Sequence, residues 1–375
     1  MPGTGDSVSR RILVPNLGST SLKYQLLGFP SEKTLARGKV ERIAGPAEYR
    51  TALAEVLDRL LPGGIHAIGL KAIHGGPQFC GTFRVDKAVI AALREFEPAA
   101  PLHNPIYILA IETLRALAPD IPLVAVFETG FHRTMPEAAA CYGVPRVWRE
   151  QFGIRRYGFH GASHRYVSER VPAILGRGAG GLRLVSCHLG GSSSICAIQN
   201  GVSVDTTMGF SPQSGLENAT RHGDLDPFAV LFLMDRLGYS TSRMRQELLL
   251  HGGLAGLSGI PGGDVRDLEA VGSPGARLAL EVFAYQVRKT IGAYAAAMGG
   301  LDALAFTGGI GENSASLREA CCRGLEFLGI RLDRERNRSL SGDRVVSPEG
   351  ASVPVLALAT NEELIVARET AALLW

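Results

Sequence analysis

The chain of 375 residues is longer than one hydrophobic core usually organises, so we expect two domains. Its apolar content of 46% supplies two cores, and 39 basic against 36 acidic side chains leave a formal charge of +3. This near balance gives no field for a polyanion, so no nucleic-acid partner is expected. No run of about 18 apolar residues occurs, which argues against a membrane partner. The six scattered cysteines form no C-x-x-C pair, so we expect neither a zinc site nor disulfides. A reducing, cytoplasmic location is therefore predicted.

The first predicted element is a β-hairpin close to the N-terminus. Residues 12–14 and 22–27 are β-like runs, and a turn at 16–21 with the sequence NLGSTS joins them. Consecutive backbone N–H groups in such a turn form a concave site that attracts phosphate oxygens, and the hydroxyls of residues 19–21 add donors. Taken alone, the turn is more simply an ordinary one.

The segment that follows alternates between helix and strand signals. Residues 47–61 and 106–118 have helical periodicity, and the short apolar run 121–127 follows them. This alternation predicts α/β layering. Histidines such as His74 and His132 stand beside turns here. They are the right type for a phosphoryl-transfer site, although any single one is more often structural.

A second hairpin repeats the design of the first about 170 residues later, which is what a duplication leaves. Residues 184–188 lead into the turn 189–194, LGGSSS, and residues 195–198 leave it. Two such turns in equivalent places favour phosphate binding over two ordinary turns. We therefore expect two related domains that face each other across a cleft.

The third glycine-rich element follows the longest predicted helix, residues 276–298. A strand at 303–307 passes through Gly308 and Gly309 into a helix start at residues 313–315, a junction that suits a nucleotide. The chain contains neither a P-loop nor a Rossmann fingerprint. Residues 331–343 are expected to be a solvated connector.

Eight stretches together resemble the acetate kinase family. They are 16–23 (NLGSTSLK), 74–76 (HGG), 100–105 (APLHNP), 126–136 (VFETGFHRTMP), 155–167 (RRYGFHGASHRYV), 205–210 (DTTMGF), 306–314 (FTGGIGENS) and 360–364 (TNEEL). The resemblance spans nearly the whole chain, in order. It implies an α/β, duplicated actin-like (ribonuclease H-like) fold with two domains around a nucleotide cleft. The implied domains are residues 1–135 plus 363–375, and residues 136–362.

The same resemblance implies the reaction and the site. ATP with Mg²⁺ would phosphorylate acetate reversibly, giving acetyl phosphate and ADP by direct in-line transfer in a protein that is usually a homodimer. The implied catalytic residues are Arg221, His160, Glu128 and His103. The implied acid-binding residues are Lys71, Ile73, Leu102, Phe159 and Pro212. The nucleotide would contact His188, Gly190, Gly191, Ser192, Asp264, Arg266, Gly309, Gly311 and Asn313, and Asn16 and Glu362 would organise Mg²⁺.

Three departures from the family pattern fall at this site. Lys71 stands where the family has arginine, so the charge stays but the planar fork is lost. Glu128 stands where the family has aspartate, which changes the carboxylate's reach by about 1.5 Å, a misplacement that can cost about 10²-fold in rate. Gly191 stands where the family has asparagine, and one lost donor at such a site typically costs about 10² to 10³ in kcat.

Several functions stay open on this basis. Acetate is the first expectation, because Ile73 in place of a smaller aliphatic residue narrows the acid pocket. A propionate- or butyrate-type kinase is the variant within the same class. A weakly active nucleotide-binding regulatory homologue is the alternative from another class, and use of pyrophosphate is a lesser option because the Asp264 and Arg266 pair favours adenosine.

Overall fold

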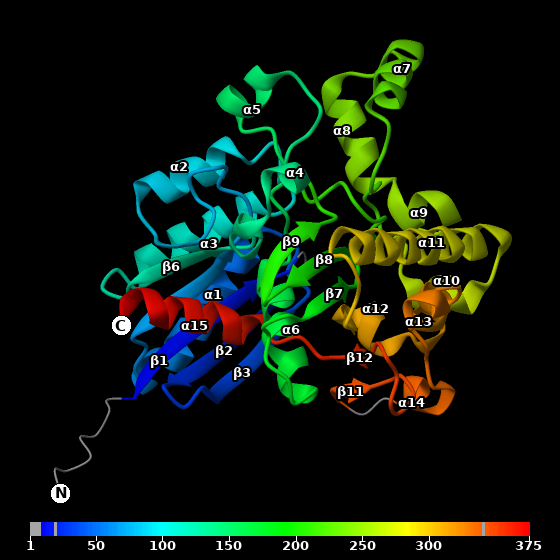
Figure 1. The fold of residues 1–375 in the computed structure, drawn as a ribbon. Helices are drawn as coiled ribbons and strands as arrows, with labels where there is room; N and C mark the ends of the chain where they lie inside the picture. Colours follow the sequence, from blue (N-terminus) through cyan, green and yellow to red (C-terminus); the bar gives the residue numbers. More distant parts are fainter. Residues whose placement is uncertain (1–8, 19–20, 340–341) are drawn as a thin grey trace, which may run out of the picture. The chain divides into compact units, whose positions relative to one another are not determined.

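The computed structural model describes residues 9–18, 21–339 and 342–375. These divide into two compact units, one formed by the chain up to Gly130 together with Asn361–Trp375, the other by Phe131–Thr360 (Figure 1). The domain boundaries expected after residue 135 and before residue 363 stay a prediction. None of the helices in the described ranges has the length and apolar character needed to cross a membrane.

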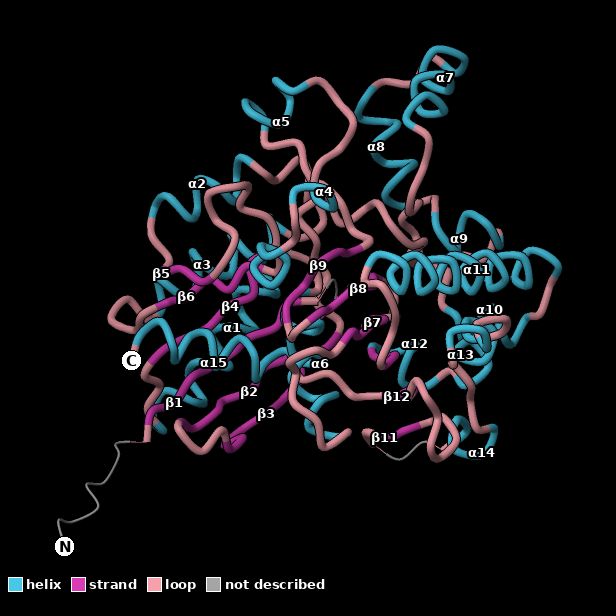
Figure 2. The backbone as a smooth tube through the Cα atoms, in the orientation of Figure 1, coloured by secondary structure: helices cyan, strands magenta, loops and turns pink. Residues whose placement is uncertain are grey.

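The first unit is built on a six-stranded mixed sheet with the order β3-β2-β1-β4-β6-β5 (Figure 2). Its strands are β1 (Arg10–Leu17), β2 (Ser21–Phe29), β3 (Lys33–Glu41), β4 (Ala67–Ala72), β5 (Thr82–Arg84) and β6 (Leu123–Phe127). The first three form an antiparallel meander, whereas β1, β4 and β6 run parallel. The predicted first hairpin is therefore present as β1 and β2.

Helices cover this sheet. They are α1 (Pro46–Leu60), α2 (Lys87–Glu95), α3 (Asn104–Leu117) and α15 (Glu362–Leu374), with a 3-10 turn at Leu61–Gly63. The helix α15 brings Val366 and Ala367 onto strand residues such as Ile12 and Val124, and all four are fully buried. The end of the chain thus completes the core that its beginning starts.

The second unit repeats the strand pattern of the first, with the order β11-β12-β10-β7-β8-β9. Its strands are β7 (Arg183–His188), β8 (Ser194–Gln199), β9 (Val202–Thr206), β10 (Ala303–Thr307), β11 (Arg344–Val345) and β12 (Val355–Ala357). Again the first three strands, β7 to β9, form an antiparallel meander. Strand β7 pairs in parallel with β10, and β10 pairs in parallel with β12. The short strand β11 pairs antiparallel with β12 at the edge of the sheet. The repeat confirms the duplicated two-domain α/β fold.

Helices lie on both faces of the second sheet. The unit contains α4 (Glu137–Ala140), α5 (Arg146–Phe152), α6 (Gly161–Ile174), α7 (Pro227–Leu237), α8 (Thr241–Leu250), α9 (Gly253–Ser258), α10 (Val265–Val271), α11 (Pro274–Ala297), α12 (Gly308–Asn313), α13 (Ala315–Cys322) and α14 (Arg334–Arg338), with 3-10 turns at Gly130–Thr134 and Glu326–Leu328. Phe283 of α11 packs in one cluster with Val185 and Phe306, and Val167 of α6 packs with Leu184. Successive strand residues alternate between these two layers.

Two sequence expectations about this unit were wrong. The glycine turn after β10 is itself a helix, α12, in which Ile310 and Gly311 donate their N–H groups to the carbonyl of Leu189. Residues 331–343 are not a plain connector, because α14 lies within them and buries Asn337. Asp333 begins that helix by accepting two backbone N–H bonds at its N-terminus.

Candidate active site

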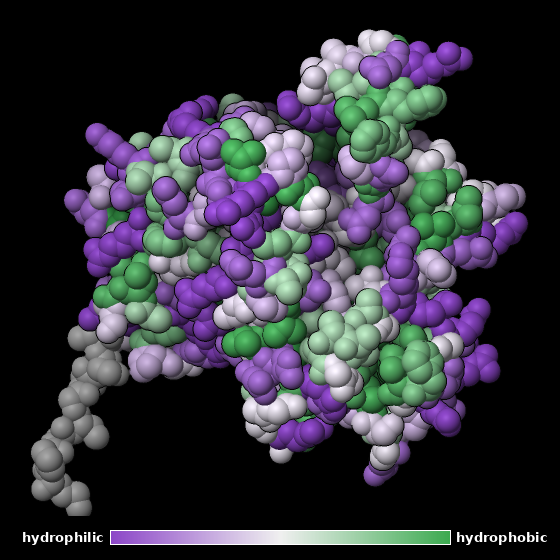
Figure 3. Space-filling model, turned by 45° about the horizontal axis from the view of Figure 1, so that its top comes forward, coloured by the Kyte–Doolittle hydropathy of each residue, from purple (hydrophilic) through white to green (hydrophobic). Residues whose placement is uncertain are grey.

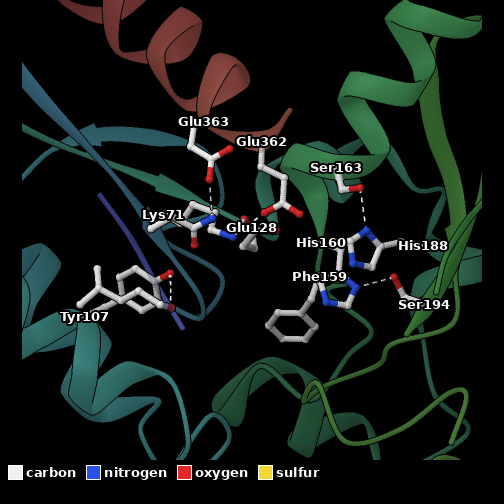
Figure 4. A network of polar contacts seen from close by, with 12 residues as sticks. Lys71, Tyr107, Glu128, Phe159, His160, Ser163, His188, Ser194, Glu362 and Glu363 are labelled. Atoms are coloured by element: carbon white, nitrogen blue, oxygen red, sulfur yellow. Dashed lines mark hydrogen bonds and ion pairs between the residues drawn. The ribbon is translucent and has the colours of Figure 1, made fainter. Parts of the chain in front are cut away.

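A charged cluster lies in the first unit where parallel strands end. Lys71 stands near the end of β4, Glu128 follows β6, and Glu362 begins α15. The Nζ atom of Lys71 pairs with Oε2 of Glu362 and lies 4.0 Å from Oε1 of Glu128 (Figure 4). Strands β4 and β6 run parallel, and the N–H group of Glu128 donates to the Ala72 carbonyl at 2.7 Å. The side chains of Lys71 and Glu128 therefore lie close together at the carboxyl ends of these two strands.

Two carboxylates share one ammonium in this cluster. Burial alone would lower the pKa of Lys71, but the negative charges around it, first that of Glu362, outweigh burial and raise that pKa well above its usual value. Burial also raises the pKa of nearby Tyr107 to about 12. Lys71 is therefore a fixed cation here.

Asn16 and the start of α15 form a second contact in this unit. The Nδ2 of Asn16 donates to Oε1 of Glu363 at 2.7 Å, which leaves the amide oxygen as the ligand atom Asn16 can offer to a cation. Asn361 caps the helix by accepting the N–H of Leu364, and so fixes the first turn that carries Glu362. Ser19 and Thr20 of the predicted phosphate turn lie outside the described residues.

One buried amide joins the two segments that carry the expected acid-binding residues Ile73 and Leu102. Asn104 is fully buried, accepts the N–H of His74 and donates to the His74 and Leu93 carbonyls. It thereby ties the end of β4, where Ile73 is buried, to the start of α3, where His103 is the first flanking residue. Leu102 is 39% exposed. Sequence reasoning missed Asn104, although its place in the APLHNP stretch was visible.

In the second unit, His160 is held by three independent constraints. Its backbone is left-handed, with φ 56° and ψ 30°, at the start of α6. Its ring stacks on His188 with centroids 4.3 Å apart, and its Nδ1 lies 2.8 Å from the hydroxyl of Ser194 (Figure 4). His188 is in turn bonded to Ser163 at 2.8 Å. Residues in such sparsely populated conformations cluster at functional sites.

Phe159 and Pro212 are held through their carbonyl groups. The Phe159 carbonyl lies 2.9 Å from Nε2 of His132, whose pKa burial lowers to about 4, so this ring is neutral and donates that bond. The Pro212 carbonyl accepts Nη1 of Arg221 at 2.8 Å. The arginine is buried, which lowers its pKa to about 10, still well above neutrality.

The Arg221 loop is bonded to the second glycine turn. Ala219 donates to the Gly191 carbonyl at 3.0 Å, and the Asn218 side chain accepts the N–H of Ser193 at 2.6 Å. Asn218 N–H closes the loop onto the Arg221 carbonyl. A buried cation and a turn rich in backbone donors thus belong to one rigid assembly, which suits an anion.

A pocket of about 530 Å³ opens beside this assembly. It is lined by Gly190, Gly191, Ala219, Leu254, Gly262, Gly263, Asp264, Val265, Arg266, Glu269, Gly309, Ile310, Asn313 and Ser314. Six of the predicted nucleotide residues are among them. His188, Ser192 and Gly311 are not, and Gly311 instead packs its backbone against Leu189.

Two helix starts border the pocket. Asp264 caps α10 and pairs with Arg266, whose Nη2 lies 2.6 Å from Oδ2. At the other helix start, Gly308 precedes the lining residue Gly309 and adopts φ 77°, and a Cβ there would meet the Leu189 carbonyl at 2.6 Å. Glycine is therefore required where β10 turns into α12.

The acetokinase family model matches residues 47–368. The chain belongs to the acetokinase family. Across 392 aligned residues it is 42% identical to the acetate kinase of Carboxydothermus hydrogenoformans, covering 96% of this chain and 98% of that protein. It is 44% identical to the propionate kinase of Citrobacter rodentium, covering 96% of each. The resemblance stated from the sequence is confirmed.

Solved structures agree with this membership. The crystal structure of Porphyromonas gingivalis acetate kinase superposes with a TM-score of 0.87 at 37% identity, covering 98% of this chain and all of that one. A propionate kinase from Francisella tularensis reaches a TM-score of 0.86 at 32% identity, covering 96% and 98%. The fold is that of acetokinases. An acetate kinase and a propionate kinase resemble this chain to a similar degree, both in sequence identity and in TM-score.

Proposed function

We propose that the chain is an acetate kinase, which transfers the γ-phosphoryl group of ATP to the carboxylate of acetate, reversibly and by direct in-line displacement. The observation that carries this proposal is the pocket of about 530 Å³ whose glycine turns are bonded to the loop of Arg221. Backbone donors and a buried cation are what the spread negative charge of a transferring phosphoryl group requires. Membership of the acetokinase family fixes the acceptor as a carboxyl group.

Each group then has a task that its chemistry supports. Arg221 and His160 neutralise the phosphoryl group as it moves, and the pocket beside Asp264 and Arg266 holds adenosine. Lys71 provides the positive charge that attracts the acid's carboxylate, as a point charge rather than a planar fork. Glu128 supplies the carboxylate for positioning, and His103 helps to hold the phosphate.

The residues of the first unit fit Mg²⁺. Asn16 offers an amide oxygen, and Glu362 offers a carboxylate that is now paired with Lys71. Mg²⁺ prefers such oxygen ligands, keeps several waters and is completed by substrate phosphates. When bound, the ion would screen the phosphate charges.

The decisive test is a panel of acids from acetate to butyrate with ATP and Mg²⁺, with the acyl phosphate trapped as its hydroxamate. We expect acetate to give the highest kcat/KM, because Ile73 is a bulky buried side chain. A higher kcat/KM for propionate or butyrate assigns the chain to the second acid class. No hydroxamate with any of them contradicts the kinase proposal.

A regulatory nucleotide-binding role is the second candidate, favoured by the joint changes at Lys71, Glu128 and Gly191. It predicts that ATP raises the melting temperature while turnover stays absent. The triple variant Lys71→Arg, Glu128→Asp, Gly191→Asn separates the two candidates, because restored family residues would then create activity. A fall in activity shows instead that the site is tuned to its own residues.

We also propose that the chain is a cytoplasmic homodimer. The helix α7 exposes large apolar side chains, with Phe228 75% and Phe232 66% exposed, and apolar atoms gather on the α7 and α8 surface (Figure 3). Such a patch typically marks a protein interface. Light scattering is expected to give twice the chain mass of 39.9 kDa, and Phe228→Glu with Phe232→Glu is expected to give monomers.

The cysteines of the chain are free thiols, in keeping with a reducing compartment.

A further inference from the structure

His160 and three side chains behind it form one hydrogen-bonded chain. The Ser194 hydroxyl lies 2.8 Å from Nδ1 of His160 and also 2.8 Å from Nε2 of His164. Nδ1 of His164 lies 2.9 Å from the hydroxyl of Ser186. Ser186, Ser194 and His164 are fully buried, so bulk water does not interrupt the chain.

The protons of this chain can be counted. A serine hydroxyl carries one proton, and a neutral imidazole carries one on its two nitrogens. Burial, together with the neighbouring rings of His132 and His188, keeps the pKa of His164 well below its usual value, so its ring is neutral. Because each hydroxyl donates only once, Ser194 can donate to His160 or to His164 but not to both.

The direction of the donors decides which nitrogen of His160 carries its proton. If Ser186 donates to His164, His164 to Ser194, and Ser194 to Nδ1 of His160, then neutral His160 must hold its proton on Nε2. In the opposite direction, neutral His160 would hold it on Nδ1. An anionic phosphoryl oxygen needs a donor, and Ser194 already takes Nδ1, so only the first direction gives neutral His160 a proton to offer.

The same contacts fix the ring itself. The left-handed backbone and the stacking on His188 set the plane of the ring, while a half-turn of the ring would put a C–H group against the Ser194 oxygen. The bond to Ser194 thus distinguishes the two ring orientations. No carboxylate takes part in the bonds of this four-residue chain, so the hydroxyls carry out the orienting role that a carboxylate often has behind a histidine.

We propose that Ser194, backed by His164 and Ser186, is a positioning residue that holds His160 as the Nε2–H tautomer, ready to donate to the phosphoryl group. The inference rests on the proposed function for the role of His160, but the tautomer is a property of the protein without substrate. Ser194 therefore acts through His160, and its loss should lower kcat more than it raises KM.

The test is nitrogen NMR on protein labelled with ¹⁵N-histidine, together with steady-state kinetics. The His160 signals are assigned by their loss in His160→Asn. We expect wild-type His160 to show a protonated Nε2 and an unprotonated Nδ1 at pH 8. Ser194→Ala is expected to mix the two tautomers and to lower kcat at least 10-fold, with KM for ATP within twofold, and Ser194→Thr is expected to restore both.

Ser168→Ala is the matched control, because Ser168 lies on α6, is buried, and bonds the Arg165 carbonyl. It should leave tautomer and kcat unchanged. If Ser194→Ala does not fold, Ser186→Ala removes the far end of the chain and is expected to mix the tautomers as well. An unchanged His160 tautomer in the folded variant, or a protonated Nδ1 in the neutral wild-type ring, overturns the inference. If the wild-type protein forms no acyl phosphate but His160 shows the predicted tautomer, only the proposed function is overturned.

Discussion

Lys71 and Glu362 form an ion pair although 291 residues separate them in the chain. Their side chains are only 15% and 14% exposed, and Glu128 lies 4.0 Å from the same ammonium. Removing one partner of a buried ion pair typically costs about 3 to 5 kcal/mol. Lys71→Met should therefore destabilise the protein by about 3 kcal/mol in urea titrations, because it leaves two carboxylates facing each other.

Added Mg²⁺ should recover part of the stability that Lys71→Met loses, since the ion replaces the missing positive charge. The matched control is Lys39→Met in the exposed Lys39–Glu41 pair, where the expected change is below about 1 kcal/mol. A Lys71→Met variant as stable as the control would contradict the structural role of the cluster. Recovery that is equal in both variants would mean that Mg²⁺ acts elsewhere.

Gly191→Asn tests the altered phosphate turn. A Cβ added at Gly191 meets nothing within 4 Å, so the backbone leaves room for a side chain to start there. If its amide reaches the phosphates, kcat should rise by about 10-fold or more, since one such donor is typically worth 10² to 10³.

The contrasting variant is Gly308→Ala in the facing turn. That residue has φ 77°, and its new Cβ would lie 2.6 Å from the Leu189 carbonyl. We expect lower ATP affinity and a lower melting temperature. If calorimetry shows the same change in ATP affinity for Gly191→Asn and Gly308→Ala, then Gly191 does not have more room for a side chain than Gly308.

Arg318 supports, through α12, the pocket that we propose to hold adenosine. The side chain is 1% exposed and donates to Oδ1 and the carbonyl of Asn337 and to the carbonyls of Gly311 and Glu312. Each buried acceptor left without a donor costs about 1 to 3 kcal/mol. Arg318→Met should lower both unfolding free energy and ATP affinity, measured by urea titration and calorimetry, while the exposed Arg323→Met should change neither.

Buried neutral histidines predict the pH dependence of stability. The folded pKa of His132 is about 4 and that of His164 lies well below 6.5, whereas both rings titrate near 6.5 when unfolded. The unfolded chain then binds more protons as the pH falls, so stability is full above pH 7 and declines from about 6.5 towards 4. Urea titrations at pH 8, 6 and 5 should show this decline, and His132→Asn should make it shallower. A flat profile would mean that these rings are not held neutral.

Local signals carried much of the prediction of secondary structure. The helix expected at 276–298 is α11 (Pro274–Ala297), where Ser273 supplies the cap and Pro274 the first turn. The strand expected at 303–307 is β10. Periodicity, caps and glycines determine such elements within a few residues, so a single sequence suffices for them.

Contacts between distant segments could not be predicted in the same way. Nothing local to Ser194 indicates that His160 and His164 both bond its hydroxyl, and nothing near Asn104 indicates that it joins β4 to α3. The resemblance to the acetate kinase family named His160 as a site residue, but neither Ser194 nor Asn104, and none of these bonds. Asn337 illustrates the limit, because a polar residue in a charged stretch looks solvated until its partner, Arg318, is seen.

The helix α15 belongs to the first unit but is the last element of the chain to be synthesised. Strands β1 and β4 cannot bury Ile12 and Ala67 fully until Val366 and Ala367 have been synthesised, since these four share one cluster. The second unit is continuous in sequence, from Phe131 to Thr360. On the ribosome, domains generally fold as their sequence becomes available. The unit translated first is therefore the one that matures last, and a chain truncated after Thr360 and released from the ribosome should show a protease-resistant second unit and a protease-sensitive first unit.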